Sequence, residues 1–178
     1  KDYSNRRNIR TYPNYRNILI LTQPTPVSCV QVIDSHQVEL SSFEDTRVAE
    51  MAPYSEAEHI SLNESFQVPP AIPFGSQPPH GWCFYYEKAS YARQLGNWDE
   101  VLSLGEQAIS YGFFAKDQIE WMPFLQAYAY ADQTARLNEL ASFMTSDLPA
   151  LQQACHILTA MPLNSATSKK INQLFCSK

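Results

Sequence analysis

Glycine is scarce in this sequence: only 5 of the 178 residues are glycines. Loops that cradle phosphate groups need several closely spaced glycines, as in the GxGxxG pattern or the Walker-type GxxxxGK pattern. Neither pattern occurs, and the GxSxG pattern that surrounds the nucleophile of many serine hydrolases is missing as well. The sequence therefore shows no motif for nucleotide binding or for serine-based catalysis.

Long apolar stretches are missing too. The longest runs, such as NILILT at 17–22, have the length of a strand, whereas a helix that crosses a bilayer needs about 20 apolar residues. No signal peptide is recognisable. Because the first residue is Lys and not Met, we expect a trimmed or processed chain.

An excess of positive charge is also lacking, since the net charge is −5. No overall field draws the chain to nucleic acid or anionic lipid, and we expect no nucleic-acid partner. The first sixteen residues are the exception. They carry Lys1, Arg6, Arg7, Arg10 and Arg16 against Asp2. This basic arm has three interpretations: a solvated arm, a segment that lay beside a membrane, or a contact for a polyanion.

Cysteine and histidine are few and widely scattered. The cysteines are Cys29, Cys83, Cys155 and Cys176, and no CxxC or zinc-type spacing occurs. An even number of cysteines permits disulfides, but we expect buried thiols. The four histidines share no metal-ligand spacing. Convergence of Asp34, His36, His80 and Glu87 on a metal is a minor alternative, and we expect no cofactor.

A proline-rich connector at 63–80, NESFQVPPAIPFGSQPPH, divides the chain. Repeated prolines remove backbone donors and fix φ, so neither a helix nor a sheet interior is expected there. Its apolar members, among them Ile72 and Phe74, suggest that the connector is held against a surface. We expect a small α/β lobe with the basic arm at 1–62 and a helical repeat domain at 81–178.

The lobe before the connector favours strands. Segments 16–23 and 28–34 are rich in β-branched residues and are separated by the turn-forming PTP. Residues 42–52 predict a short helix with Ser42 as N-cap, and 59–62 predict a third strand. Glu44 and Asp45 fit the first turn of that helix, where the helix dipole favours carboxylates.

The chain after the connector predicts six helices in three hairpins. Trp82, Tyr85, Ala89, Ala92 and Leu95 line one face of the first helix, with Tyr86 and Arg93 on other faces. Gly96 ends that helix, and Asn97 with Glu100 has the spacing of a capping box for the next. Further apolar stripes predict four more helices. One begins near 122, with Pro123 in its first turn; the next contains Leu137, Leu140, Ala141 and Met144; a fifth is opened by Ser146, Asp147 and Pro149; and a sixth has Ser165 as its cap. The predicted fold class is α+β, mostly α, with a short α-solenoid.

The hairpin at 82–113 resembles a tetratricopeptide repeat. The matching positions are Tyr85, Ala89, Leu95, Gly96, Trp98 and Ala108. The pattern departs at Ala92, Val101, Gly105 and Phe113, and the second hairpin fits less well. The resemblance covers roughly the last hundred residues and implies a helical repeat that binds a protein partner.

A second resemblance covers most of the chain. The order of SCVQVIDSH, YSEAEHI, HGWCFYYEKASYARQLGNWDEV and EWMPFLQAY is similar to the C-terminal region of large multi-pass membrane proteins of the Chloroflexi type of bacteria. Their N-terminal spans look like those of glycosyltransferases that use lipid-linked sugars. The resemblance implies membrane attachment in the full-length protein, on the extracytoplasmic face, and offers no catalytic residues to carry over.

Candidate binding residues lie among the aromatic and charged positions of the helical half. Arg93 and Gln94 could receive a peptide carboxylate or a sugar hydroxyl, although pairing of Arg93 with Glu87, Asp99 or Glu100 is the interpretation we favour. Glu120 beside Trp121 has the composition of a sugar-binding pair, but Asp117 and Glu120 also have capping spacing, which we favour. The candidates are Trp82, Tyr86, Arg93, Gln94, Glu120 and Trp121.

Three functional hypotheses follow. The first is a non-catalytic module that binds a protein partner or its own membrane domain. The second is an accessory domain that binds a carbohydrate or a lipid-linked sugar, which an exposed groove of Tyr, Trp and carboxylates would favour. The third and least favoured is a hydrolase that pairs Cys29 or Cys83 with His80.

Overall fold

The computed structural model describes residues 4–6, 9–11, 18–60, 70–76 and 79–177. Most of them are helical, which confirms the α+β, mostly α class. The strands are β1 (Ser4–Arg6), β2 (Ile9–Thr11), β3 (Leu21–Thr22) and β4 (Gln31–Val32). The α-helices are α1 (Thr46–Met51), α2 (Ala71–Phe74), α3 (Trp82–Gln94), α4 (Trp98–Ser110), α5 (Met122–Tyr130), α6 (Thr134–Phe143), α7 (Leu148–Thr159) and α8 (Ser165–Ile171).

Single helical turns complete the described part. They are η1 (Ala52–Tyr54), η2 (Ala57–His59), η3 (Gln118–Trp121), η4 (Met144–Ser146) and the π-turn η5 (Asn172–Cys176). In the ranges that the structure describes, no helix is both long enough and apolar enough to cross a membrane.

The N-terminal lobe is built on two short strands. β3 and β4 lie within the predicted strands at 16–23 and 28–34, but each is only two residues long. They pair antiparallel, with Leu21 opposite Val32. The predicted third strand at 59–62 is wrong at its first residue, because His59 ends the helical turn η2. Residues 61–62 of that prediction lie outside the described residues. β1 and β2 form a separate hairpin.

Helix α1 begins later than the sequence predicted. Asp45 is its N-cap and accepts from the Arg47 N–H at 2.9 Å. Ser42 is not the cap: its hydroxyl donates to Asp147 at the start of α7. The predicted first-turn role of Glu44 is also wrong, because its carboxylate accepts a hydrogen bond from Thr22.

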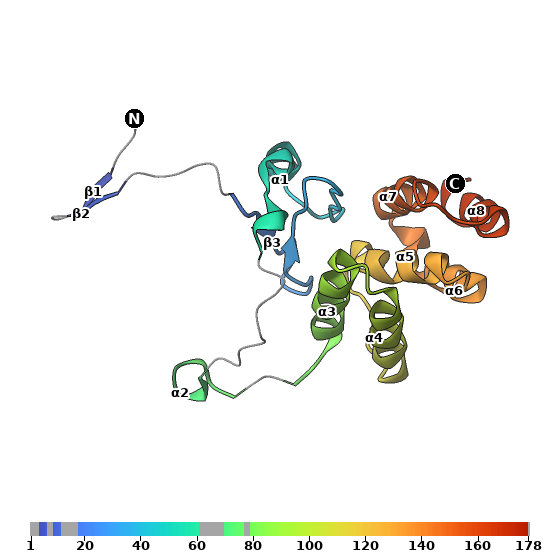
Figure 1. Cartoon of the computed structure of the whole chain (residues 1–178), viewed down its shortest axis with the longest axis horizontal. Helices are drawn as coiled ribbons and strands as arrows, with labels where there is room; N and C mark the ends of the chain where they lie inside the picture. Colours follow the sequence, from blue (N-terminus) through green and yellow to red (C-terminus); the bar gives the residue numbers. More distant parts are fainter. Residues whose placement is uncertain (1–3, 7–8, 12–17, 61–69, 77–78, 178) are drawn as a thin grey trace.

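The connector holds one helical turn despite its prolines. α2 forms at Ala71–Phe74, which contradicts the expectation that no helix persists there; a single turn needs few of the backbone donors that proline removes. Ile72 is 100% exposed, so it does not hold the connector against a surface. Figure 1 shows α2 apart from the other helices, and 61–69 and 77–78 lie outside the described residues.

Helices α3 and α4 form the predicted antiparallel hairpin. Gly96 has φ of +69°, the left-handed conformation that suits glycine, and the Asn97 side chain caps α4 through the Glu100 N–H at 3.3 Å. Asp99 and Glu100 lie in the first turn of α4. The assignment of Leu95 to the inward face is wrong, because Leu95 is 50% exposed. Tyr86, which the pattern placed on another face, is buried as well.

The reason for the burial of Tyr86 is that α3 is covered on two sides. One side packs against α4 and α5, and the other meets the N-terminal lobe, as Figure 1 shows. The inward face that the hairpin pattern predicted is Trp82, Tyr85, Ala89 and Ala92, and all four are buried.

Two further helix pairs, α5 with α6 and α7 with α8, follow along the chain (Figure 1). Pro123 lies in the first turn of α5, as predicted. Of the residues predicted to open α7, Asp147 is the cap, and it accepts from the Ala150 N–H at 3.1 Å. Asn164, and not Ser165, caps α8. The core runs through all three pairs, and its largest wholly buried side chains are Trp121, Tyr128, Phe124 and Phe175.

All four cysteines fall within the described ranges, and all are bonded. Cys29 joins Cys83, and Cys155 joins Cys176, with Cα atoms 5.2 and 5.1 Å apart. These separations suit a disulfide. The expectation of buried thiols is therefore wrong. The partners lie 54 and 21 residues apart in the sequence, so only the fold brings them together.

Candidate functional site

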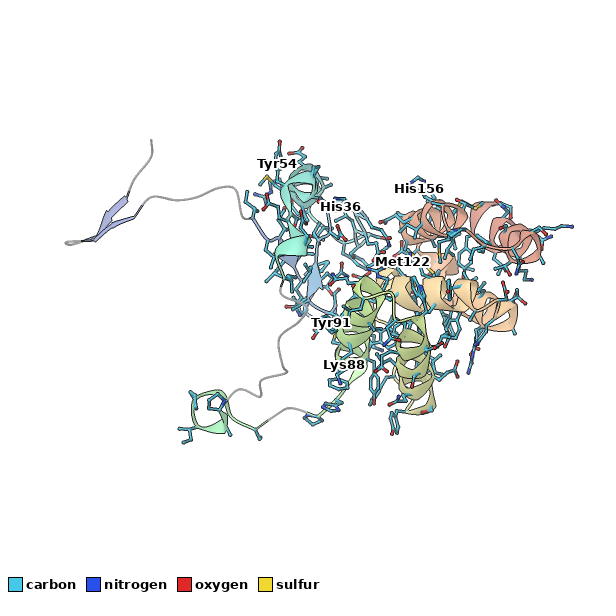
Figure 2. All side chains as sticks on the ribbon, viewed as in Figure 1. His36, Tyr54, Lys88, Tyr91, Met122 and His156 are labelled. Carbon is cyan, nitrogen blue, oxygen red and sulfur yellow. A yellow bond between two sulfur atoms is a disulfide. The ribbon has the colours of Figure 1, made fainter. Side chains whose placement is uncertain are left out.

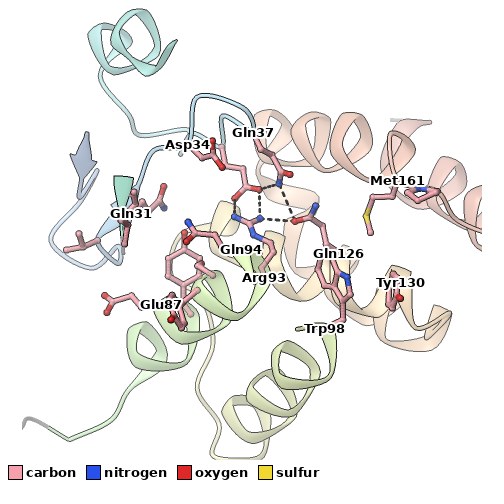
Figure 3. Close-up of a pocket in the computed structure, with 18 residues that line it drawn as sticks. Gln31, Asp34, Gln37, Glu87, Arg93, Gln94, Trp98, Gln126, Tyr130 and Met161 are labelled. Atoms are coloured by element: carbon pink, nitrogen blue, oxygen red, sulfur yellow. Dashed lines mark hydrogen bonds and ion pairs between the residues drawn. The ribbon is translucent and has the colours of Figure 1, made fainter. Parts of the chain in front are cut away.

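A cleft of about 570 Å³ lies where the N-terminal lobe meets the helices. β4 and the segment after it form one side, α3 forms another, and the remainder comes from α4, α5 and the turn before α8 (Figure 3). The lining residues discussed below are Gln31, Val32, Asp34, Gln37, Glu39, Tyr86, Glu87, Tyr91, Arg93, Gln94, Trp98, Gln126 and Tyr130.

A network of charged and amide side chains centres on Arg93. Its Nη1 donates to Oε1 of Glu39 at 2.5 Å and to Oε1 of Gln126 at 2.8 Å, while Nη2 donates to Oε2 of Glu39 at 3.1 Å. The Gln37 amide donates to Oε1 of Glu39 at 2.6 Å. Figure 3 shows these groups converging. The result is a preformed set of planar donors and acceptors.

The Arg93–Glu39 pair is largely withdrawn from solvent, with side chains 18% and 9% exposed. Burial acts to lower the pKa of Arg93, but the charge and hydrogen bonds of Glu39 outweigh it and raise that pKa above its ordinary value. The favoured partners Glu87, Asp99 and Glu100 are wrong. Glu39 comes from the N-terminal lobe, which spacing along a helix cannot indicate.

Aromatic side chains form the other main feature of the cleft. Trp98 and Tyr130 stack with centroids 5.5 Å apart and planes at 24°, and both Tyr130 and Tyr91 are exposed. Tyr86 is buried, and burial raises the pKa of its hydroxyl. The cleft thus combines exposed ring faces with a fixed polar network.

Three of the predicted binding residues, Tyr86, Arg93 and Gln94, line this cleft. The other three do not. Trp82, Glu120 and Trp121 are buried in the interior.

Glu120 fastens the lobe to the helices. Its Oε1 accepts from the Cys29 N–H at 2.6 Å, and its Oε2 accepts from the Trp82 indole N–H at 2.6 Å. Burial raises the pKa of Glu120 to about 7. The capping interpretation of Asp117 and Glu120 is wrong, because the Asp117 side chain makes no cap hydrogen bond and instead accepts from the Ser28 hydroxyl at 3.0 Å.

Sequence reasoning missed the residues that complete the cleft. Trp98 was missed because it fits a helical stripe, which indicates packing. Tyr130, the last residue of α5, is 58% exposed. Gln126 lies in the middle of α5 among apolar residues, and a lone amide in such a stretch was the available signal. For Glu39 the sequence holds no signal.

Neither the hydrolase hypothesis nor the metal-site alternative gains support from where the structure places its residues. Cys29 and Cys83 are bonded to each other, so neither sulfur is a thiol nucleophile here. Asp34 and His36 lie 3.3 Å apart at the surface. Within the described ranges, no three His, Cys, Asp or Glu side chains gather as a metal site. His36 belongs to the lobe and His156 to α7 (Figure 2).

A second cavity, of about 690 Å³, opens beside the Cys29–Cys83 bond. Its lining includes Val27, His80, Phe84, Phe113 and Lys116. Aromatic and other apolar side chains make up most of its lining.

No family model matches the chain, and no curated protein or solved structure does either. Functional inference therefore rests on the geometry of the cleft.

Proposed function

We propose that this chain is a non-catalytic binding module that holds a segment of a partner protein, or of its own membrane domain, in the cleft. The observation that carries the proposal is the apolar rim of the cleft on the lobe side. Leu21 and Val32 lie directly opposite each other in the β3–β4 ladder and are 59% and 39% exposed. Leu19 and Val30 add two more exposed aliphatic side chains. Of these four residues, Val30 and Val32 line the cleft itself. Contiguous exposed apolar surface is typical of protein interaction sites.

The cleft supports recognition better than chemistry. The most buried charged side chains of its lining, Arg93 and Glu39, neutralise each other in a two-pronged ion pair. A general base must have a proton-accepting atom available to substrate, and both Glu39 oxygens already accept hydrogen bonds. Rigid, satisfied polar groups beside exposed rings suit the orientation of a bound ligand.

A glycan is the second candidate ligand. The cleft is exposed and is lined by Tyr91, Trp98 and Tyr130 together with the carboxylates of Asp34 and Glu87, the combination that favours a carbohydrate. Ring faces can pack on the C–H faces of a sugar, and amides and carboxylates can bind its hydroxyls. The exposed aliphatic rim has no role in that case, which is why we place a protein partner first.

The proposal includes the setting of the module. The order of three helix pairs supports a tetratricopeptide-like α-solenoid, and the two disulfides support an oxidising, extracytoplasmic environment. A full-length gene product with membrane spans before Lys1 is the expected context. A gene product without spans would remove the membrane part of the proposal and leave the cleft untouched.

The test compares two exposed tyrosines at helix ends. Tyr130 lines the cleft and is 58% exposed; Tyr111, 64% exposed, follows α4 outside the cleft. The chain is screened against a library of random octapeptides and an array of bacterial and eukaryotic glycans. We expect peptide ligands whose affinity falls about tenfold in Tyr130→Ala and is unchanged in Tyr111→Ala.

The alternative outcomes decide between the candidates. Glycan ligands without peptide ligands would replace the leading proposal with the second. Ligands of neither class, or ligands that bind Tyr130→Ala as tightly as the unmodified chain, would overturn the assignment of the cleft.

A further inference from the structure

The β3–β4 ladder fixes the direction of the backbone groups of Val32. Antiparallel ladders alternate between residue pairs that exchange two hydrogen bonds and pairs that exchange none. The Ile33 N–H donates to the Ile20 carbonyl at 3.0 Å, one step from the Leu21–Val32 pair. Leu21–Val32 is therefore a pair without mutual hydrogen bonds. The N–H and C=O of Val32 point away from β3.

That outer edge belongs to the cleft. Val30, Gln31 and Val32 all line it. In the described part of the chain, no group hydrogen-bonds to the backbone N–H or C=O of Val32. By the same alternation, the backbone groups of Val30 point outward as well. A row of unpaired backbone donors and acceptors on a strand edge is a template for another strand.

We infer that the partner segment binds as an added β-strand on the Val30–Val32 edge, an inference that rests on the proposed function. Strand addition draws its affinity from backbone hydrogen bonds and its selectivity from alternate side chains. The Val32 N–H and C=O supply one pair of hydrogen bonds, and Val30 supplies the next. Helix α3 faces this edge across the cleft through Glu87 and Tyr91.

The charges of the cleft define the segment further. Asp34 and Glu87 carry negative charge, while the single arginine of the lining, Arg93, is matched by Glu39. The ligand is therefore basic. Every second side chain of an added strand continues the exposed face of Leu21 and Val32, so those positions are aliphatic. The occupant is an extended protein segment that alternates aliphatic and basic residues.

The first experiment follows amide hydrogen exchange by NMR, residue by residue. In the ligand-free chain, the Ile33 amide is expected to be protected by its bond to Ile20, and the Val32 amide is expected to exchange fast. Addition of the peptide Ac-Lys-Val-Lys-Val-Lys-Val-Lys-NH2 is expected to protect Val32. Protection of Val32 as strong as that of Ile33 before any peptide is added would overturn the inference, because the edge would already be covered.

The second experiment removes the backbone bonds alone. Val32→Pro deletes the outward N–H and leaves the ladder, since proline is tolerated on an edge when its nitrogen faces outward. Its affinity for the peptide is expected to fall about tenfold or more. A form of the same peptide with N-methyl groups on the residues that face β4 is expected to show an equal loss of affinity for the unmodified chain. This second measurement does not depend on whether Val32→Pro folds. A peptide with Glu in place of Lys tests the charge and is expected to bind more weakly.

The outcomes separate the inference from the function on which it rests. Binding that depends on Tyr130 but leaves Val32 unprotected and tolerates N-methylation would overturn strand addition and keep the proposed function. Equal binding of the Lys and Glu peptides would overturn the basic partner. Absence of any peptide binding, with glycans bound instead, would overturn both.

Discussion

Glu120 provides a quantitative test of how the N-terminal lobe is fastened to the helices. Its carboxyl group is wholly buried and accepts hydrogen bonds from Cys29 of the lobe and Trp82 of α3. Burial raises its pKa from 4.5 to about 7, because a charge is less well solvated inside the protein than in water. The hydrogen bonds act in the opposite direction and are outweighed.

The sign of the effect follows from proton binding. In the folded chain Glu120 holds its proton up to about pH 7, whereas in the unfolded chain it releases the proton near pH 4.5. The stabilisation from this group is therefore fully present below pH 4.5 and is lost as the pH rises through 7. Integration between pH 5 and pH 8 gives a loss of at most about 2.5 kcal/mol in the free energy of unfolding.

The assay is urea-induced unfolding at pH 5, 6, 7 and 8 for the unmodified chain and for Glu120→Gln. The glutamine has the same shape and does not ionise. One of the two donors loses its acceptor, which costs about 1–3 kcal/mol independently of pH. We expect the difference in free energy of unfolding between the two chains to change by up to about 2.5 kcal/mol from pH 5 to pH 8. A difference that stays constant over this range would refute the reasoning.

Glu106 supplies the matched control. Burial acts to raise its pKa, but hydrogen bonds from Arg136 and Tyr128 hold that pKa below the ordinary value. Glu106 is therefore mostly ionised from pH 5 to pH 8, in both the folded and the unfolded chain. The difference between Glu106→Gln and the unmodified chain should change by no more than about 0.2 kcal/mol over this range, whatever its size.

Three further predictions concern packing and cross-linking. Gly105→Ala would place a Cβ atom 2.8 Å from Phe124, which is wholly buried; this costs about 1–3 kcal/mol against a helix-propensity gain of about 1 kcal/mol, so Tm should fall. Ala108→Trp is expected to unfold the helical half, because the methyl group is wholly buried, and circular dichroism at 25 °C should show the loss. Replacement of both Cys29 and Cys83 by Ser opens a loop of 54 residues and should lower the free energy of unfolding by about 4 kcal/mol; an unchanged urea midpoint would contradict it.

Features set by neighbours in the sequence could be predicted. The Gly96 turn, the Asn97 cap and the Asp147 cap all depend on groups within four residues of one another, and the spacing of such groups is visible in the sequence. The prediction of a buried face on α3 is correct for Trp82, Tyr85, Ala89 and Ala92, because helical periodicity is also a local property of the sequence.

Features set by contacts between distant segments could not be predicted. Arg93 and Glu39 are 54 residues apart, and so are Cys29 and Cys83. Helical periodicity placed Tyr86 on a face away from α4, which is correct, but it could not show that the lobe covers that face. The cleft is the product of this covering. Of the predicted candidates, only Tyr86, Arg93 and Gln94 line it.

The cleft is therefore a shared product of the lobe and α3, and its stability depends on the bonds that join them. The Cys29–Cys83 disulfide, the Glu120 hydrogen bonds and the Arg93–Glu39 pair all connect the lobe to the helices. Only the last of these lines the cleft. A ligand that spans β4 and α3 binds the docked arrangement alone, so by linkage it must stabilise that arrangement. Peptide binding should consequently weaken in Glu120→Gln, although Glu120 does not line the cleft, while Glu106→Gln should bind as the unmodified chain does.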